Sequence, residues 1–172
     1  YPRLCLIHVA TLSVTAMPRP TILCVSSYFK GSAFIERAKE EGCHTILLTT
    51  EQKLKEPWPR HALDEVFALK TFEDRRGVIN SVAYLMKTRQ INRIVALDDF
   101  DIELGAALRE HFRLPGFYET TARHFRDKLA MRTRARDLGV PIPEFVGAFN
   151  TDEVRAFLAR VPGPWLLKPR GS

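Results

Sequence analysis

The sequence predicts an α/β fold in which a doubly wound parallel sheet is followed by the beginning of a second domain. Short runs of continuously apolar residues recur along the amino-terminal part, and such runs are typical of strands that are buried on both faces. Segments with helical spacing of apolar residues lie between them, so strands and helices alternate and the strands run parallel. A chain of 172 residues, 45% of them hydrophobic, suffices for one packed domain and part of another.

The first strand–helix–strand unit follows directly from this pattern. Thr21–Ser26 is an unbroken apolar run and predicts a buried strand. A short helix is expected at Ser32–Glu41, with Ser32 as a candidate cap and Gly42 closing its end. His44–Thr49, rich in isoleucine and leucine, predicts the second strand.

A second unit follows a proline-rich loop. Glu65–Leu69 predicts a weaker strand, and Thr71 is a candidate N-cap for a helix that continues through Thr88. Ile91–Leu97 is the fourth expected strand. The next helix ends at Pro115-Gly116, because proline and glycine both interrupt helical backbone.

We expect residues 17–116 to form the α/β domain and residues 117–172 to begin the next one. Residues 1–16 need a separate interpretation, since Leu4–Ala16 is a largely apolar run similar to a secretory signal but too short to span a bilayer. The alternative is that Met17 is the natural start and that residues 1–16 are a leader or a non-native segment. We favour this alternative, because nothing downstream suits secretion.

Open α/β sheets bind ligands at the carboxyl ends of their strands, and two loops qualify. The loop Ser26–Ser32 has one glycine and no GxGxxG pattern, so it lacks a dinucleotide fingerprint. The loop after the fourth strand carries Asp98, Asp99 and Asp101, followed by Glu103. Asp101 is also a candidate helix cap, so a structural and a functional role both stay open. In a functional role, these carboxylates would hold an amine-bearing substrate or orient a basic residue of the next domain.

The segment 125–172 predicts the order helix, strand, helix, strand. A basic helix carrying Lys128 ends at Gly139. Val140–Phe145 contains two prolines, which force extended backbone. Asn150 resembles the N-cap of a second helix with an apolar stripe.

The last predicted strand delivers a lysine to a turn. Trp165–Leu167 is a short apolar run, so we expect a buried strand with the ammonium group of Lys168 at its end. The backbone amides of the following Gly171-Ser172 turn could approach an anion. Lys128 and Lys168 are therefore the best candidates for phosphate binding.

Three motifs in this region carry a resemblance to a known family. They are Arg-Asp-Lys at 126–128, Gly-Val-Pro-Ile-Pro-Glu-Phe at 139–145, and Pro-Trp-Leu-Leu-Lys-Pro-Arg-Gly-Ser at 164–172. In this order they resemble the start of an ATP-grasp domain, as in biotin carboxylase, the D-alanine–D-alanine ligases and other ATP-dependent carboxylate–amine ligases. The preceding residues fit the Rossmann-like preATP-grasp domain of that family more loosely.

The resemblance implies an enzyme that uses ATP and Mg²⁺ to activate a carboxylate as an acyl phosphate, which an amine or similar nucleophile then attacks. It assigns Lys128 and Lys168 to the nucleotide phosphates and leaves the catalytic residues unknown. The Mg²⁺ ligands are expected beyond the end of this chain, so we expect no metal site within it and no turnover by this piece alone. The implied partners are ATP, a carboxylate and an amine, without nucleic acid or membrane, and a homodimer is compatible with the family.

Two alternatives come from other classes of protein. One is a free-standing α/β binding or regulatory module, for example a receiver-like domain that uses Asp98 and Asp99, although a receiver places its acidic pair after the first strand. The other is a nucleic-acid-binding protein, suggested by the net charge of +6. The basic residues are spread along helices and form no nucleic-acid motif, and neither alternative accounts for residues 139–172.

The cysteine pattern indicates a cytoplasmic protein. The 3 cysteines have no CxxC spacing, which disfavours both disulfides and structural zinc. The 5 histidines are scattered without a metal-binding pair.

Overall fold

The computed structural model describes residues 19–171, so the interpretation of residues 1–16 and of Met17 lies outside the described residues. Within this range the chain forms a four-stranded parallel sheet in the order β3-β2-β1-β4. The strands are β1 (Thr21–Ser26), β2 (His44–Thr50), β3 (Glu65–Leu69) and β4 (Arg93–Ala96). The predicted α/β fold with a parallel sheet is confirmed.

Helices alternate with the strands, and further helices follow after the last strand. The α-helices are α1 (Ser32–Glu40), α2 (Arg75–Met86), α3 (Ile102–Phe112), α4 (Glu119–Arg126), α5 (Lys128–Asp137) and α6 (Thr151–Arg160). Short 3-10 turns lie at η1 (Glu51–Lys53), η2 (Arg60–Ala62) and η3 (Asp99–Asp101). No helix in the described range 19–171 is both long and apolar enough to cross a lipid bilayer.

The sheet is covered on both faces, as a doubly wound fold requires. On one face, Leu23 of β1 belongs to a buried cluster with Val82 of α2 and Leu108 of α3. On the other face, Cys24 of β1 lies in a second cluster with Ile35 of α1. Successive strand residues point to opposite faces, so the continuously apolar β1 supplies both clusters.

Two predicted helix caps are wrong by a few residues. Gly31, with φ +82°, occupies the N-cap position of α1, and Ser32 is the first helical residue. Asp74 rather than Thr71 caps α2, because its carboxylate accepts a hydrogen bond from the Gly77 amide at 3.0 Å. The Thr71 hydroxyl instead accepts a bond from an amide two residues later, in the turn before the helix.

The two strands predicted near the carboxyl end do not form. Val140–Phe145 and Trp165–Leu167 have no strand assignment, and no strand of the described residues pairs with either segment. The expected burial is also wrong, since Leu166 and Leu167 are 77% and 86% exposed. A strand is stable only when a neighbour accepts its backbone hydrogen bonds and covers its apolar side chains, and apolar sequence alone supplies neither.

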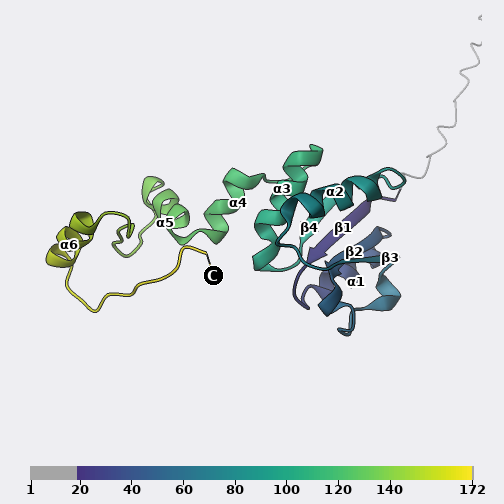
Figure 1. The fold of residues 1–172 in the computed structure, drawn as a ribbon, viewed down its shortest axis with the longest axis horizontal. Coiled ribbons are helices and arrows are strands. Elements are labelled where there is room, and N and C mark those ends of the chain that lie inside the picture. The colour runs from purple at the N-terminus through teal and green to yellow at the C-terminus, as the bar shows by residue number, and fades with distance from the viewer. Residues whose placement is uncertain (1–18, 172) are drawn as a thin grey trace, which may run out of the picture.

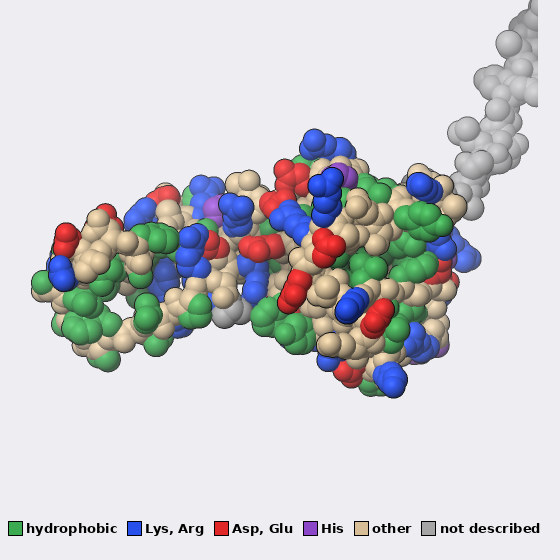
Figure 2. Space-filling model, in the orientation of Figure 1, with side chains coloured by type: hydrophobic (Ala, Val, Ile, Leu, Met, Phe, Trp, Pro, Cys, Tyr) green, Lys and Arg blue, Asp and Glu red, His purple; other side chains and the backbone are tan. Residues whose placement is uncertain are grey.

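The helices after the sheet form an arm that leads away from it. α4 packs against α3 on one side and α5 on the other, and α6 lies farthest from the sheet (Figure 1). The segment after α6 then runs back toward the junction of α4 and α5 (Figure 1). Figure 2 shows apolar side chains on the surface of this arm. Phe149, Trp165 and Leu166 are among the large apolar residues that are exposed in this part of the chain.

Candidate functional site

The carboxyl ends of β1 and β4 lie side by side at a change of direction in the sheet. β1 pairs with β4 on one side and with β2 on the other. The helix that follows β1 covers one face, and the helix that follows β4 covers the opposite face. In open α/β sheets this arrangement leaves a crevice where ligands bind. The acidic residues singled out in the sequence follow β4 at this point.

Asp98 is buried, and each of its carboxylate oxygens has a close neighbour. One carboxylate oxygen accepts a hydrogen bond from the Phe100 amide at 2.9 Å. The other oxygen lies 2.9 Å from the ammonium group of Lys30, in the loop after β1. Burial acts to raise the pKa of Asp98, but the Phe100 amide and the Lys30 charge outweigh it and hold the pKa below its usual range. Asp98 therefore links the loops that follow β1 and β4.

Asp101 makes a second link between the same two loops. Its carboxylate accepts a hydrogen bond from the Ser27 amide at 2.7 Å. It occupies the N-cap position of α3, as the structural alternative expected, but its side chain makes no capping hydrogen bond. Its side chain is buried, and burial raises the pKa of Asp101 above the ordinary value.

Asp99 is the carboxylate of this group that faces solvent. Its side chain is 58% exposed and lies 2.5 Å from the guanidinium group of Arg126, at the end of α4. The same guanidinium lies over the ring of Phe100, 4.8 Å from its centroid. Phe100 in turn stacks on Tyr28 with the ring centroids 4.9 Å apart. The sequence indicated Arg126 only as part of the Arg-Asp-Lys motif at 126–128, and neither its contact with Asp99 nor a role for Phe100 was predicted.

α4 is fixed to the α/β body at both ends. At its start, Glu119 pairs with Arg75 of α2, and at its end Arg126 pairs with Asp99. Between them Ala122 is fully buried. α4 therefore holds the beginning of α5 at a defined place relative to the carboxyl ends of the strands.

The two lysine-bearing segments meet at the first turn of α5. Lys128 is the first residue of α5, and its backbone amide donates to the carbonyl of Arg170 at 2.9 Å. Lys168, two positions before Arg170, is exposed. The structure thus brings the neighbourhoods of both predicted phosphate ligands together, although they are 40 residues apart (168 − 128).

Asp127 organises this meeting point. Its carboxylate caps α5 by accepting hydrogen bonds from the amides of Leu129 at 3.0 Å and Ala130 at 3.2 Å. It also pairs with Arg170 through two guanidinium nitrogens. The Arg170 charge, with the two amides, lowers the pKa of Asp127 to about 2.

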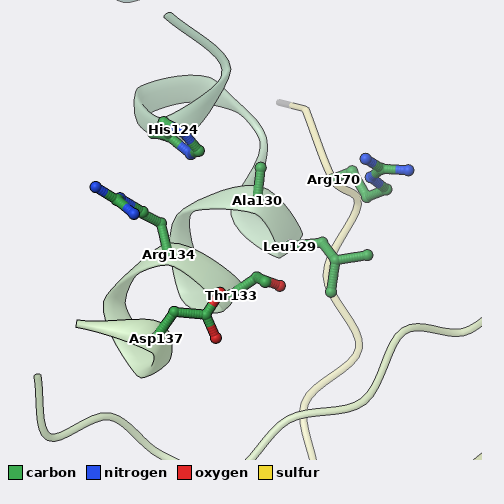
Figure 3. Close-up of a pocket in the computed structure, with 7 residues that line it drawn as sticks. All are labelled: His124, Leu129, Ala130, Thr133, Arg134, Asp137 and Arg170. Carbon is green, nitrogen blue, oxygen red and sulfur yellow. The ribbon is translucent and has the colours of Figure 1, made fainter. Parts of the chain in front are cut away.

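A pocket of about 390 Å³ lies beside the first turns of α5 (Figure 3). It is lined by His124, Leu129, Ala130, Thr133, Arg134, Asp137 and Arg170. Figure 3 shows His124 of α4 above the helix and the segment with Arg170 running beside it. Two arginines and one aspartate line the pocket, so its charged lining is mainly basic.

A divalent cation has no ready set of ligands in the described residues. Within the described range no group of three or more histidine, cysteine, aspartate or glutamate side chains is placed to hold a metal ion. Asp98, one buried carboxylate near the crevice, is ion-paired with Lys30, and Asp101, the other, is hydrogen-bonded to the Ser27 amide. These residues do not fit a magnesium site, and we assign none to them.

Comparison with known proteins shows which family this part of the chain resembles. Residues 35–116 match the ATP-grasp N-terminal domain. The chain is 23% identical over 136 residues to an L-arginine-specific L-amino acid ligase of Bacillus subtilis, an alignment that covers 79% of this chain and 33% of that protein. The chain therefore spans about a third of the length of this relative.

Solved structures show the same fold. An L-amino acid ligase from Bacillus licheniformis superposes with a TM-score of 0.71 at 21% identity, over 91% of this chain and 39% of that one. An N5-carboxyaminoimidazole synthetase from Staphylococcus aureus, solved in complex with ADP, superposes with a TM-score of 0.63 at 16% identity, over 89% of this chain and 39% of that one. The resemblance to the ATP-grasp family is thereby confirmed for the fold of this chain.

Proposed function

Because the chain carries an ATP-grasp N-terminal domain, we propose that it is the amino-terminal part of an ATP-dependent ligase that joins a carboxylate to an amine or a similar nucleophile. One observation in the structure supports this most directly. The Lys168 segment folds back onto the first turn of α5, where Lys128 begins the helix. Two lysine-bearing segments are thereby brought together at the start of α5, an arrangement suited to a polyanion.

The proposed role of Lys128 and Lys168 is to bind the phosphates of ATP. The Lys168 segment supports this role, because it carries an exposed ammonium group next to the start of α5. The first amides of α5 are bonded to Asp127 and Arg170, so the lysine side chains rather than the helix end would bind the phosphates. Phosphoryl transfer depends mainly on positioning and on neutralising the charge of the phosphates. Lysines placed in this way would supply part of both effects.

The reaction proposed for the whole ligase has two steps. A carboxylate oxygen of the substrate attacks the terminal phosphorus of ATP, the bond to ADP breaks, and an acyl phosphate forms. The nucleophile then attacks the acyl carbon, inorganic phosphate leaves, and an amine nucleophile gives up a proton to a base or to solvent. Mg²⁺ would neutralise phosphate charge in the first step. We assign neither a metal ligand nor a catalytic residue within this chain, and we expect the chain alone to be inactive.

The carboxylates Asp98, Asp99 and Asp101 are proposed to serve the substrate side of the site. Their place after β4, beside the carboxyl end of the neighbouring β1, supports this role. Asp98 and Asp101 would shape the crevice, since both are buried and join the loops after β1 and β4. Asp99 would act at the surface, either toward an amine-bearing substrate or through Arg126.

The names of the relatives suggest a first set of substrates. The curated relative and one solved structure are both called L-amino acid ligases, so amino acids are the first carboxylates and amines to test. The proposed partners are accordingly ATP, a small carboxylate and a small amine. Consumption of ATP, together with free thiols at Cys24 and Cys43, fits a cytoplasmic location.

Trapping of the acyl phosphate tests the proposal. The ligase that contains this chain is incubated with ATP, Mg²⁺ and single amino acids, with hydroxylamine as the nucleophile. A carboxylate-dependent release of ADP, accompanied by a hydroxamate, is the expected result. Release of ADP that does not depend on the added carboxylate would count against the proposed ligase function. So would the absence of hydroxamate with every amino acid and simple carboxylate tried.

A further inference from the structure

Asp127 joins three segments of the chain at one carboxylate. Its backbone amide donates to the Arg123 carbonyl at 2.9 Å and so closes α4. Its side chain caps α5 through the amides of Leu129 and Ala130. The same carboxylate pairs with Arg170, 43 residues further along the chain.

The contact with Arg170 has two parts that reinforce each other. The guanidinium group reaches Asp127 through Nε at 3.0 Å and through a second nitrogen, a bidentate geometry that fixes its orientation. The carbonyl of the same residue accepts the Lys128 amide at 2.9 Å. The guanidinium also lies over the ring of Phe149, 5.5 Å from its centroid. Arg170 is therefore held from three sides.

We propose that Asp127 is a positioning residue that, through Arg170, holds the Lys168 segment at the first turn of α5. The inference rests on the proposed function insofar as the segment carries a phosphate-binding lysine. Trp165–Leu167, just before this segment, is exposed and does not anchor it. Without the ion pair, residues 168–171 would therefore be free to move away from Lys128. With the ion pair in place, both lysines can bind the same anion.

The carboxylate of Asp127 is partly shielded, which strengthens the pair. Its side chain is 15% exposed, whereas that of Arg170 is 55% exposed. A bidentate pair with one partner out of bulk water is stronger than the fully exposed pairs that contribute little. The pair between Asp152 and Arg155 on α6 is of that exposed kind, with both side chains mostly in solvent. It is therefore a suitable control.

Substitution can separate the two roles of Asp127. Asparagine caps helices about as well as aspartate, so Asp127→Asn keeps the bonds to Leu129 and Ala130 and removes the charge that Arg170 needs. Arg170→Met removes the ion pair from the other side and leaves the cap untouched. Asp152→Asn is the matched control, because it removes an aspartate–arginine pair near the start of a different helix.

Hydrogen exchange on the 172-residue chain gives the first readout. We expect Asp127→Asn and Arg170→Met each to speed exchange of the Lys128 amide by on the order of tenfold, since its acceptor is the Arg170 carbonyl. The amides of Leu129 and Ala130 should keep their protection in both variants, and Asp152→Asn should change none of the three. Unchanged exchange of the Lys128 amide in both Asp127→Asn and Arg170→Met would overturn the inference.

Nucleotide affinity in the whole ligase gives the second readout. Titration with a non-hydrolysable ATP analogue should show that each variant binds it with an affinity lowered by on the order of tenfold. The double variant should bind the analogue no more weakly than either single variant. If the parent binds the analogue and the variants bind it equally well, the positioning role is wrong. If the parent itself does not bind the analogue, the proposed function fails, while the exchange experiment still decides whether Asp127 holds the segment.

Discussion

Arg126, the last residue of α4, pairs with Asp99 in the turn after β4, with 2.5 Å between the guanidinium and carboxylate groups. The guanidinium also lies over Phe100, so one side chain makes a charged and an aromatic contact with the same turn. Arg126 stands two positions before Lys128. The pair therefore links the carboxyl end of β4 to the helix that carries the first candidate phosphate ligand.

The first prediction concerns Asp99. In the whole ligase, Asp99→Asn should lower turnover while barely moving the melting temperature, because Asp99 lies mostly in solvent and Arg126 keeps its contact with Phe100. Initial rates and thermal melts of parent and variant give the comparison. Glu73→Gln, an exposed acidic position before α2, is the control and should leave both unchanged. Equal activity of Asp99→Asn and parent would mean that Asp99 has only a structural role.

The second prediction concerns the loop after β1. Gly31 has φ +82°, and a β-carbon there would lie 2.8 Å from the Cβ of Leu97, so Gly31→Ala combines backbone strain with a steric clash. We expect a loss of about 2–4 kcal/mol in the free energy of unfolding, measured by urea denaturation.

Gly42→Ala provides the matched control for this prediction. Gly42 has φ +78° but no atom within 4 Å of the added carbon, so only the backbone cost of about 1 kcal/mol applies. Equal losses of stability in the two variants would show that the Leu97 side chain moves aside without destabilising the fold.

The strands of the sheet were predictable because a strand that is buried on both faces has a continuously apolar sequence. β1 has no polar alternation, and it supplies Leu23 to one core cluster and Cys24 to the other. The segments Val140–Phe145 and Trp165–Leu167 show similar local signals, yet they form no strand. Strand formation depends on a partner elsewhere, and a local pattern carries no information about that partner.

The candidate site was predictable by residue type but not by contact. The position of Asp98, Asp99 and Asp101 after a strand indicated where they would lie. That Asp101 would reach the Ser27 amide, 74 residues away, depends on the pairing of β1 with β4. In the same way, the sequence indicated Arg170 only as part of the motif at 164–172. Its contact with Asp127 depends on the path of the chain after α6.

The third prediction is a pH dependence that centres on Asp64. Burial acts to raise its pKa, but the ammonium group of Lys39 and the Thr45 amide outweigh this and lower the pKa of Asp64 to about 2. A carboxylate whose pKa falls on folding stabilises the fold above its ordinary pKa. This stabilisation is lost as the pH falls from about 4 through about 2.

Urea denaturation at several pH values tests this prediction. Asp64→Asn should be less stable than the parent at pH 7 by on the order of 1–2 kcal/mol, allowing for partial solvent screening, and the gap should shrink as the pH approaches 2. Glu40→Gln, which removes a carboxylate from an exposed pair on α1, should follow the parent at every pH. A gap that is constant with pH would show that the ionisation of Asp64 is not linked to folding.

The fourth prediction concerns the residues before the sheet. Deletion of residues 1–16 should leave cooperative thermal unfolding and the melting temperature unchanged, because β1 begins at Thr21 and follows two prolines at Pro18 and Pro20. Melting curves of the shortened and complete chains decide the matter. Loss of a cooperative transition in the shortened chain would show that the deleted residues contribute to the core.

The fifth prediction concerns Lys128 and Lys168. If both bind the phosphates of ATP, then Lys168→Met should lower the affinity of the whole ligase for an ATP analogue by roughly ten- to a hundredfold. The reason is that an ammonium group opposite a polyphosphate in a partly dry site contributes on the order of 1.5–3 kcal/mol to binding. Lys128→Met should act in the same direction. Lys87→Met, at an exposed lysine just after α2, removes the same charge far from α5 and should leave the affinity unchanged.

The 172-residue chain provides the contrast that separates its own contribution from that of the whole ligase. It spans 39% of the length of the structural relative from Bacillus licheniformis, so most of a site formed by the longer protein would be absent. The lysine substitutions should therefore change little in this chain, whose own affinity for the analogue should be weak. Isothermal titration of the parent and of the two lysine variants, in the whole ligase and in the 172-residue chain, gives the six affinities needed. Tight magnesium-dependent binding by the 172-residue chain would contradict a site shared with the rest of the ligase, and unchanged binding in both substituted ligases would exclude the two lysines from the phosphate site.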